Sequence, residues 1–245
     1  FGLDQSFIKY KKTKLPKTTK LIIFAFVPET ISRINSFWKH YSEFGNKYGF
    51  KPIFKIEKNK LILKKMILHK NTNLEKLKKK IPTIKKIDIF YKRRFLHYVF
   101  KFPYTFSYLR SFKRNNLIFL NILMFNIFDY FNLKNKKEFY LKSYNKIVKD
   151  NVSDANNMYM EKNYNSHFSK LILMINKNFK NKNYKCLFLI LPQMHDLFLS
   201  QKNKSNYKSF FKKLSSNNKI DILDTTNIFL TKKNFTNLYL EDKYG

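Results

Sequence analysis

The sequence predicts an α/β fold in which a parallel sheet carries helices on both faces. Three apolar runs have the length and composition of buried strands, at 21–27, 186–191 and 220–223. Between these runs lie long segments in which apolar residues recur every three or four positions, as they do in amphipathic helices. Strands that alternate with helices along a chain form parallel sheets, so we expect α/β architecture.

The first strand leads into a polar corner that is a candidate functional site. The run 21–27, LIIFAFV, is rich in branched and aromatic residues and is expected to be buried on both faces. Pro28 ends the strand, and helical spacing then predicts one helix that runs to about His40. Glu29 and Thr30 lie at this corner, where open α/β sheets bind ligands. The alternative is that both residues only cap the helix start.

The later elements follow from the same patterns. We expect a β-hairpin at 52–68, a Lys-rich helix at 73–80 ended by Pro82, helices at 117–133, 138–149 and 153–180, then the second strand, a helical region reaching 214, and the third strand. The residues of the 153–180 helix that are expected to face the core are Phe168, Leu171, Ile172 and Ile175. The region 52–150 is expected to be an insertion.

Length and charge set limits on the class of protein. The chain has 245 residues, enough for one α/β domain with a substantial core, and a net charge of +34 from 50 Lys and Arg against 16 Asp and Glu. Such a charge ordinarily indicates nucleic acid or an anionic membrane. Here it is mostly Lys, spread along the chain and accompanied by abundant Asn, Ile, Phe and Tyr. We therefore interpret much of it as the bias of an AT-rich coding sequence.

Neither disulfide chemistry nor a membrane span is indicated. The single cysteine, Cys186, lies in an apolar run and is expected to pack as a small buried side chain. The longest apolar stretch, 117–133, is interrupted by Asn121, Asn126 and Asp129. We interpret it as an amphipathic or buried helix, with docking on a membrane surface as the alternative.

The segment 87–111 interleaves aromatic and basic residues, most densely from Arg93 to Lys101. Bases stack on aromatic rings while Arg and Lys follow phosphates, so this is the best nucleic-acid-like patch in the chain. The favoured interpretation is a partly buried segment whose basic side chains reach solvent, because no nucleic-acid-binding signature accompanies it. No specific nucleic acid partner is expected.

Several chemical motifs are absent from the sequence. With four Gly in the chain there is no Gly-rich phosphate loop, and there is no paired-cysteine site, HExxH or GxSxG. Neither a metal nor another cofactor is therefore expected. His195 follows the second strand and is a candidate substrate-facing residue, although adjacent residues of a helix do not face each other and Asp196 cannot orient it. The histidines without a partner at ligand or triad spacing are His40, His69, His97 and His167.

Five phrases in a fixed order carry a family resemblance. They are FGLDQS, LIIFAFVPETISRIN with KPIFKIEKNKLIL, LFLILPQMHDL, IDILDTTNIF and YLEDKYG. Together they resemble a bacterial branch of the SGNH, or GDSL-type, hydrolase superfamily. In that branch GxGxxGxDQ precedes the first strand, a phrase like FxPENIxRN follows it, and an Asp shortly before a GH phrase closes the domain. The resemblance implies a three-layer, flavodoxin-like sheet with a small β-hairpin and helical insertion.

The resemblance also implies ester hydrolysis or acyl transfer. In this family a Ser is the nucleophile, a His is the general base and an Asp orients the imidazole. The oxyanion is held by backbone N–H groups and an Asn side chain. The substrates implied are acyl esters of carbohydrates or of cell-envelope glycans, and the compartment, cytoplasm or envelope, stays open.

Carried over residue by residue, Asp242 matches the orienting Asp of the triad. Without the resemblance it would be interpreted as a surface loop acid. Gly2, Asp4 and Gln5 match the end of the Gly-rich phrase. Gly2 and Gln5, together with Glu29 and Thr30, are expected to line the oxyanion and substrate site. Thr30 stands where the family has Asn, so the donor there is a hydroxyl with a different reach.

By this resemblance the nucleophilic Ser would lie before Phe1 and the catalytic His after Gly245. The expectation is a single domain over 1–245 that is truncated at both ends and belongs to an esterase or acyltransferase. One alternative is a degenerate SGNH fold kept for binding, which Thr30 makes credible. The other is a basic module without enzymatic activity that binds nucleic acid or anionic membrane through 93–101.

Overall fold

Three parallel strands form the main sheet of this mixed α/β protein. The computed structural model describes residues 2–42, 49–64 and 74–239. The sheet contains β1 (Leu21–Phe26), β4 (Lys185–Ile190) and β5 (Asp221–Asp224) in the order β1-β4-β5. Both pairs of neighbouring strands are parallel. The three strands and their parallel arrangement confirm the sequence prediction.

The second sheet is the antiparallel hairpin of β2 (Ile53–Glu57) and β3 (Lys60–Lys64). Its turn residues, Lys58 and Asn59, both have positive φ, as a tight two-residue hairpin turn requires. The predicted hairpin is therefore confirmed as far as Lys64, and 65–68 lies outside the described residues.

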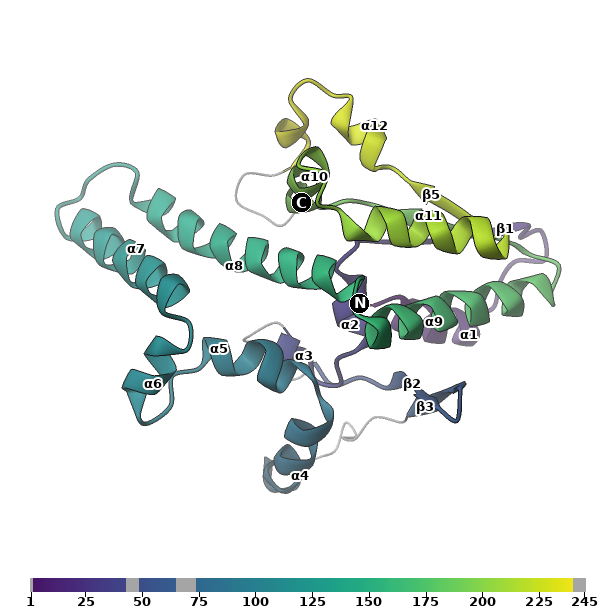
Figure 1. Cartoon of the computed structure of the whole chain (residues 1–245), viewed down its shortest axis with the longest axis horizontal. Coiled ribbons are helices and arrows are strands. Elements are labelled where there is room, and N and C mark those ends of the chain that lie inside the picture. The colour runs from purple at the N-terminus through teal and green to yellow at the C-terminus, as the bar shows by residue number, and fades with distance from the viewer. Residues whose placement is uncertain (1, 43–48, 65–73, 240–245) are drawn as a thin grey trace.

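The helices occupy most of the remaining described chain (Figure 1). They are α1 (Leu3–Lys12), α2 (Thr30–Ile34), α3 (Lys39–Ser42), α4 (Leu74–Ile87), the π-helical turn η1 (Tyr91–Phe95), α5 (Leu96–Tyr98), α6 (Tyr104–Leu109), α7 (Phe112–Tyr130), α8 (Lys136–Met158), α9 (Lys162–Lys180), α10 (Met194–Gln201), α11 (Asn206–Asn218), α12 (Thr226–Leu230) and the 3-10 turn η2 (Phe235–Leu238).

The core lies between the main sheet and helices α9 and α11. The ring of Phe26 on β1 lies 5.9 Å from that of Phe168 on α9 and 5.8 Å from that of Phe211 on α11, measured between centroids. The four residues of α9 that were expected to face the core are completely buried, as their helical spacing predicts: Phe168, Leu171, Ile172 and Ile175.

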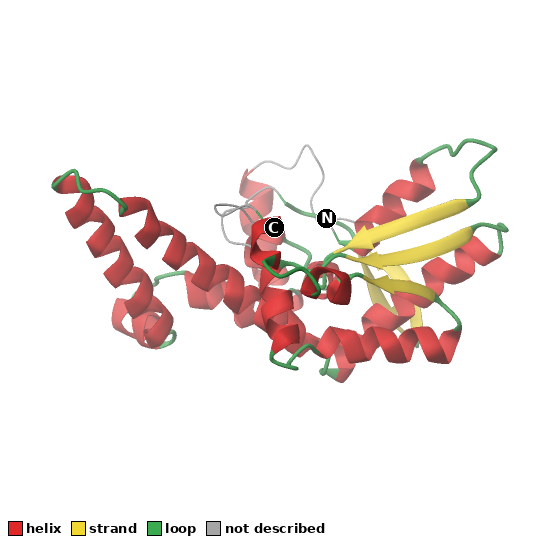
Figure 2. Cartoon of the chain, turned by 90° about the horizontal axis from the view of Figure 1, so that it is seen from above, coloured by secondary structure: helices red, strands yellow, loops and turns green. Residues whose placement is uncertain are grey.

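The opposite face of the main sheet is not covered by the described helices. On β1, Leu21 is 48% exposed and Ile23 is 51% exposed, and Leu223 on β5 is 45% exposed. Figure 2 shows the strands in front of the helices from this side. The prediction that the first strand is buried on both faces was wrong, because an apolar residue at every position does not reveal which face is covered. Helices on both faces, and hence a three-layer fold, are not confirmed.

The helix predicted from the corner to about His40 is two short helices, α2 and α3. The interruption is caused by Asp88, a buried residue from a distant part of the chain. Its Oδ2 accepts hydrogen bonds from the backbone N–H groups of Phe37 (2.8 Å) and Trp38 (3.0 Å) and from the Ser36 hydroxyl (3.2 Å). N–H groups bound to this carboxylate cannot donate to helix carbonyls, so the helix ends.

Two other predicted helix boundaries were wrong. Helix α4 continues through Pro82 to Ile87, and Ile84 beyond the proline is completely buried in the core. Tertiary packing of this kind stabilises a helix against its local propensity. Helix α8 runs without interruption to Met158, and the break falls before Lys162, where α9 begins.

Helices α7 and α8 pack against each other and project away from the main sheet (Figure 1). We call residues 102–140, which contain α6, α7 and the start of α8, the arm. The base of the arm lies near the sheet edge at which the candidate site is built.

Candidate functional site

The corners that follow β1 and β4 meet at the carboxyl edge of the main sheet. Glu29 follows β1, and Gln193 follows β4. Asp196, in the first turn of α10, accepts a hydrogen bond at its Oδ2 from the backbone N–H of Gln193 at 2.9 Å. Burial, together with the carboxylates of Glu29 and Asp224, raises the pKa of Asp196 to about 8.

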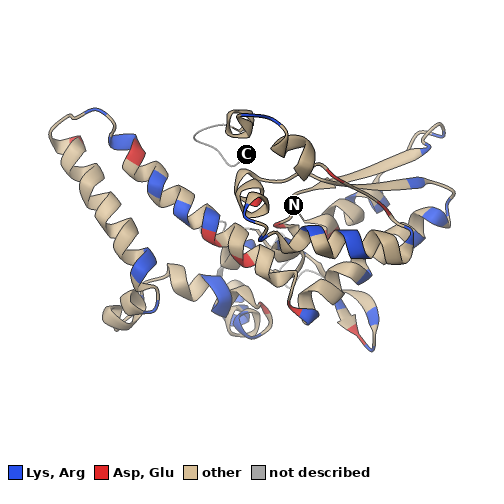
Figure 3. Cartoon of the chain, turned by 45° about the horizontal axis from the view of Figure 1, so that its top comes forward, with Lys and Arg blue, Asp and Glu red and all other residues tan. Residues whose placement is uncertain are grey.

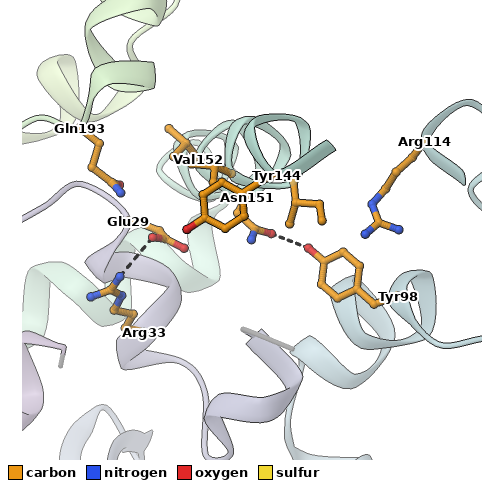
Figure 4. Close-up of a pocket in the computed structure, with 10 residues that line it drawn as sticks. Glu29, Arg33, Tyr98, Arg114, Tyr144, Asn151, Val152 and Gln193 are labelled. Atoms are coloured by element: carbon orange, nitrogen blue, oxygen red, sulfur yellow. Dashed lines mark hydrogen bonds and ion pairs between the residues drawn. The ribbon is translucent and has the colours of Figure 1, made fainter. Parts of the chain in front are cut away.

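A cleft of about 450 Å³ opens beside this edge (Figure 4). Its lining residues are Glu29, Arg33, Tyr98, Arg114, Tyr144, Ile147, Val148, Asn151, Val152 and Gln193. Glu29 and Gln193 point toward each other from the two corners, whereas Tyr144 and Asn151 come from α8. A cleft of this size with a few convergent polar groups is suited to a small ligand or to part of a larger one.

The Glu29 carboxylate is held between two guanidinium groups. Glu29 is 7% exposed, and its Oε2 lies 3.4 Å from Arg33 Nη2 while its Oε1 lies 3.5 Å from Arg94 Nη1. Glu29 makes no side-chain capping hydrogen bond to α2, so the capping alternative is not observed for this residue. Its carboxylate is both a wall of the cleft and a member of an ion-pair network.

That network explains where the basic residues of the aromatic and basic segment lie. Arg94 is buried and donates from Nε to Asp154 at 2.8 Å. Arg93 donates from Nε to the same carboxylate at 2.6 Å and forms two parallel hydrogen bonds with Glu161 at 2.6 and 3.0 Å. These two guanidinium groups are engaged inside the fold, which argues against the alternative that they bind nucleic acid phosphates or lipid headgroups.

Arg114 lies between this cleft and a second, more basic cleft of about 600 Å³, and it lines both. Its guanidinium stacks over the Tyr98 ring at 4.5 Å and donates to the backbone carbonyl of His97 at 3.2 Å. The Tyr98 hydroxyl in turn donates to Asn151 Oδ1. Arg114 forms no ion pair with a described carboxylate, and burial lowers its pKa. The Arg114 guanidinium is therefore free to donate hydrogen bonds to an oxyanion of a ligand.

Three other residues predicted to line the site, Gly2, Gln5 and Thr30, do not line the cleft. Thr30 is buried in the first turn of α2 and does not line the cleft. Gly2 precedes α1 and packs against α2, where an added Cβ would lie 3.3 Å from Arg33 Cβ. Gln5 donates from Nε2 to the carbonyl of Pro52 at 2.9 Å, so it joins α1 to the hairpin.

His195 and Asp242 are not placed in the cleft by the described structure. His195 lies on α10 with its ring 6.2 Å from that of Phe198, and burial and the charge of Lys149 lower its pKa. It lines neither of the two clefts described here. Asp242 lies outside the described residues. Within the described part of the chain no group of three or more His, Cys, Asp and Glu residues could hold a metal ion.

Of the residues that line this cleft, only Glu29 was predicted, and the polar lining residues that reach the cleft from outside the two corners are Tyr98, Arg114, Tyr144 and Asn151. A signal for two of them exists in the sequence. Tyr144, Val148, Asn151 and Val152 have the spacing of one helix face, and this face mixes polar with apolar residues. Nothing local identifies Arg114 or Tyr98, because each reaches the cleft only through the packing of the arm.

Comparison of the chain with protein-family models, curated proteins and solved structures found no match. The site is therefore interpreted from its own chemistry.

Proposed function

We propose that this chain is part of an SGNH-type serine esterase or acyltransferase and that the cleft beside Glu29 binds the acyl-ester substrate. One observation supports this most directly. The VPETISR and LPQMHD corners, which are far apart in the sequence, meet at the carboxyl edge of the parallel sheet, and Gly2 of the segment GLDQS packs on the first of them. Gly2 packs on Arg33, Arg33 pairs with Glu29, and Gln193 faces Glu29 across the cleft. This edge is where open α/β sheets carry their sites.

The proposed reaction is a two-step acyl transfer. A serine oxygen attacks the ester carbonyl and passes its proton to a histidine, and the alcohol leaves with that proton while the acyl group stays on the serine. Water or a second alcohol then takes up the acyl group. In this proposal Asp242 orients the histidine, while the serine and histidine precede Phe1 and follow Gly245. The amide, phenol and guanidinium groups of the cleft suit the hydroxyl-rich surface of a glycan ester.

The replacement of the family's Asn by Thr30 is expected to slow the proposed acyl transfer. A missing oxyanion donor typically costs about 2.7–4 kcal/mol of transition-state stabilisation. Because Thr30 does not line the cleft, its hydroxyl does not substitute for the family's Asn there. A degenerate SGNH fold that binds glycan esters without cleaving them is therefore the second candidate.

The test uses the protein encoded by the complete reading frame that contains this sequence. A fluorophosphonate probe should label one serine upstream of Phe1. Asp242→Asn should lower the hydrolysis of p-nitrophenyl acetate by about two to four orders of magnitude, because it removes the charge that orients the imidazole. The matched control is Asp221→Asn, an exposed acid at the amino end of β5, which should retain activity.

Two results would contradict the enzymatic proposal. One is a folded protein that the probe does not label, and the other is hydrolysis that survives Asp242→Asn. If an unlabelled protein still binds an acetylated oligosaccharide, and Gln193→Ala weakens that binding, the second candidate replaces the first.

A further inference from the structure

The arm exposes an unusual amount of apolar side chain. Phe102 is 85% exposed, Phe106 is 70% exposed and Tyr130 is 83% exposed. Monomeric proteins rarely expose contiguous apolar patches of this kind without an interaction that uses them. Phe102 precedes α6, Phe106 lies on α6 and Tyr130 ends α7, so exposed apolar side chains occur at both ends of the arm.

Helix α7 is apolar on the side that faces α8 and also on its outer side. The inner side is covered, since the Phe128 ring lies 4.9 Å from that of Phe139 on α8. The outer side carries Leu120, Leu123 and Ile127, which share one face by their spacing and are all exposed. No charged residue occurs between Arg114 and Asp129. The outer side thus lacks the polar surface of an ordinary solvent-facing helix.

Basic residues flank this apolar surface at both ends. Arg110 and Lys113 lie at its base, and Lys134 and Lys137 lie beyond its tip. Figure 3 shows that α7 has almost no charged residues along its length, whereas the neighbouring helix α8 carries basic residues at several positions. An apolar helix with basic and aromatic residues at its ends has the chemistry of a segment that lies in the headgroup region of a bilayer.

We propose that the arm docks on an anionic phospholipid surface, with the outer side of α7 at the boundary between headgroups and acyl chains. The net charge of +34 is complementary to such a surface. The same charge opposes a second copy of the chain as the occupant, because two strongly positive molecules would repel each other. None of the described helices is long and apolar enough to cross a bilayer. This proposal does not depend on the esterase function.

Vesicle flotation of the full chain tests this docking. The chain should float with vesicles of phosphatidylcholine containing about 30% phosphatidylglycerol, and binding should weaken between about 50 and about 500 mM NaCl. Leu120→Glu combined with Leu123→Glu should weaken binding about tenfold or more, because two charges enter the apolar surface. The matched control is Ile228→Glu with Leu238→Glu, an equal change in charge at two exposed apolar residues outside the arm, and it should bind as the unmodified chain does.

A second measurement reports how deeply the outer side of α7 enters the bilayer. Leu123→Trp should be quenched by brominated lipid, whereas Ile228→Trp should not. The proposal is overturned if the unmodified chain does not float at low salt, or if the arm variant and its control lose binding equally. It is also overturned if the arm variant binds vesicles normally but sediments as a monomer where the unmodified chain sediments as an oligomer. That result would assign the surface to contact with a second copy of the chain. Unchanged circular dichroism of the arm variant shows that it is folded.

Discussion

At the scale of single residues, the Asp196 carboxyl group makes stability depend on pH in a direction that can be measured. Its pKa is raised from 3.8 to about 8 by burial and by neighbouring carboxylates, so the folded protein holds a proton that the unfolded chain releases. Between these two values the folded state binds more protons than the unfolded state. The contribution of Asp196 to stability is therefore greatest at low pH and is lost as the pH rises toward 8.

Asp196→Asn should remove this dependence, because an amide resembles the protonated carboxyl group and can still accept the hydrogen bond from the Gln193 N–H. We expect the melting temperature of the unmodified protein to fall between about pH 5 and about pH 8 relative to that of the variant. Thermal unfolding of both proteins across this range measures the difference. Parallel curves would show that Asp196 is ionised throughout.

At the scale of elements, helix α9 joins the sheet to the rest of the core. Phe168 on this helix is fully buried, and its ring meets those of Phe26 on β1, Tyr159 and Phe211. Its removal would leave a cavity on the covered face of the sheet.

Phe168→Ala should lower the free energy of unfolding by about 3–5 kcal/mol, as for other large-to-small changes in a core. Leu173→Ala changes an apolar residue on the same helix that is partly exposed, and it should cost about 0.5 kcal/mol or less. Urea denaturation measures both. If the two variants lose similar amounts, α9 does not dock through Phe168.

The same elements show what the sequence could and could not predict. The core-facing residues of helix α9 and the positions of the three strands were predictable because their apolar patterns are local, whereas the exposed face of the sheet was not. The break between α2 and α3 was not, because it is made by Asp88 from a distant segment. Of the cleft, the sequence predicted one lining residue, Glu29. Glu29 is identified by its place after a strand, whereas Arg114 reaches the cleft only through the packing of the arm.

At the scale of the whole molecule, the net charge of +34 opposes compaction. The main acid–base pairs, such as Arg94 with Asp154, are partly or fully withdrawn from solvent and are therefore only weakly screened by salt. Repulsion between exposed lysines is screened readily.

We therefore expect the melting temperature to rise when NaCl is increased from about 20 to about 200 mM, the opposite of the effect on vesicle binding. Differential scanning fluorimetry without lipid measures this rise. A melting temperature that stays constant or falls would mean that the exposed charges are already balanced in the folded chain.

The pairing of β1 with β4 also determines the order in which parts of the protein can fold during synthesis. The hairpin, the arm and α9 all lie between these two strands in the sequence, so β1 leaves the ribosome long before its partner exists. Bringing together strands so far apart is entropically costly and slow. A nascent chain that has reached Lys180 has a complete arm but no main sheet, and its first strand is an unpaired apolar segment that a chaperone could hold. The arm can thus be complete, and can meet a membrane surface, before the main sheet has formed.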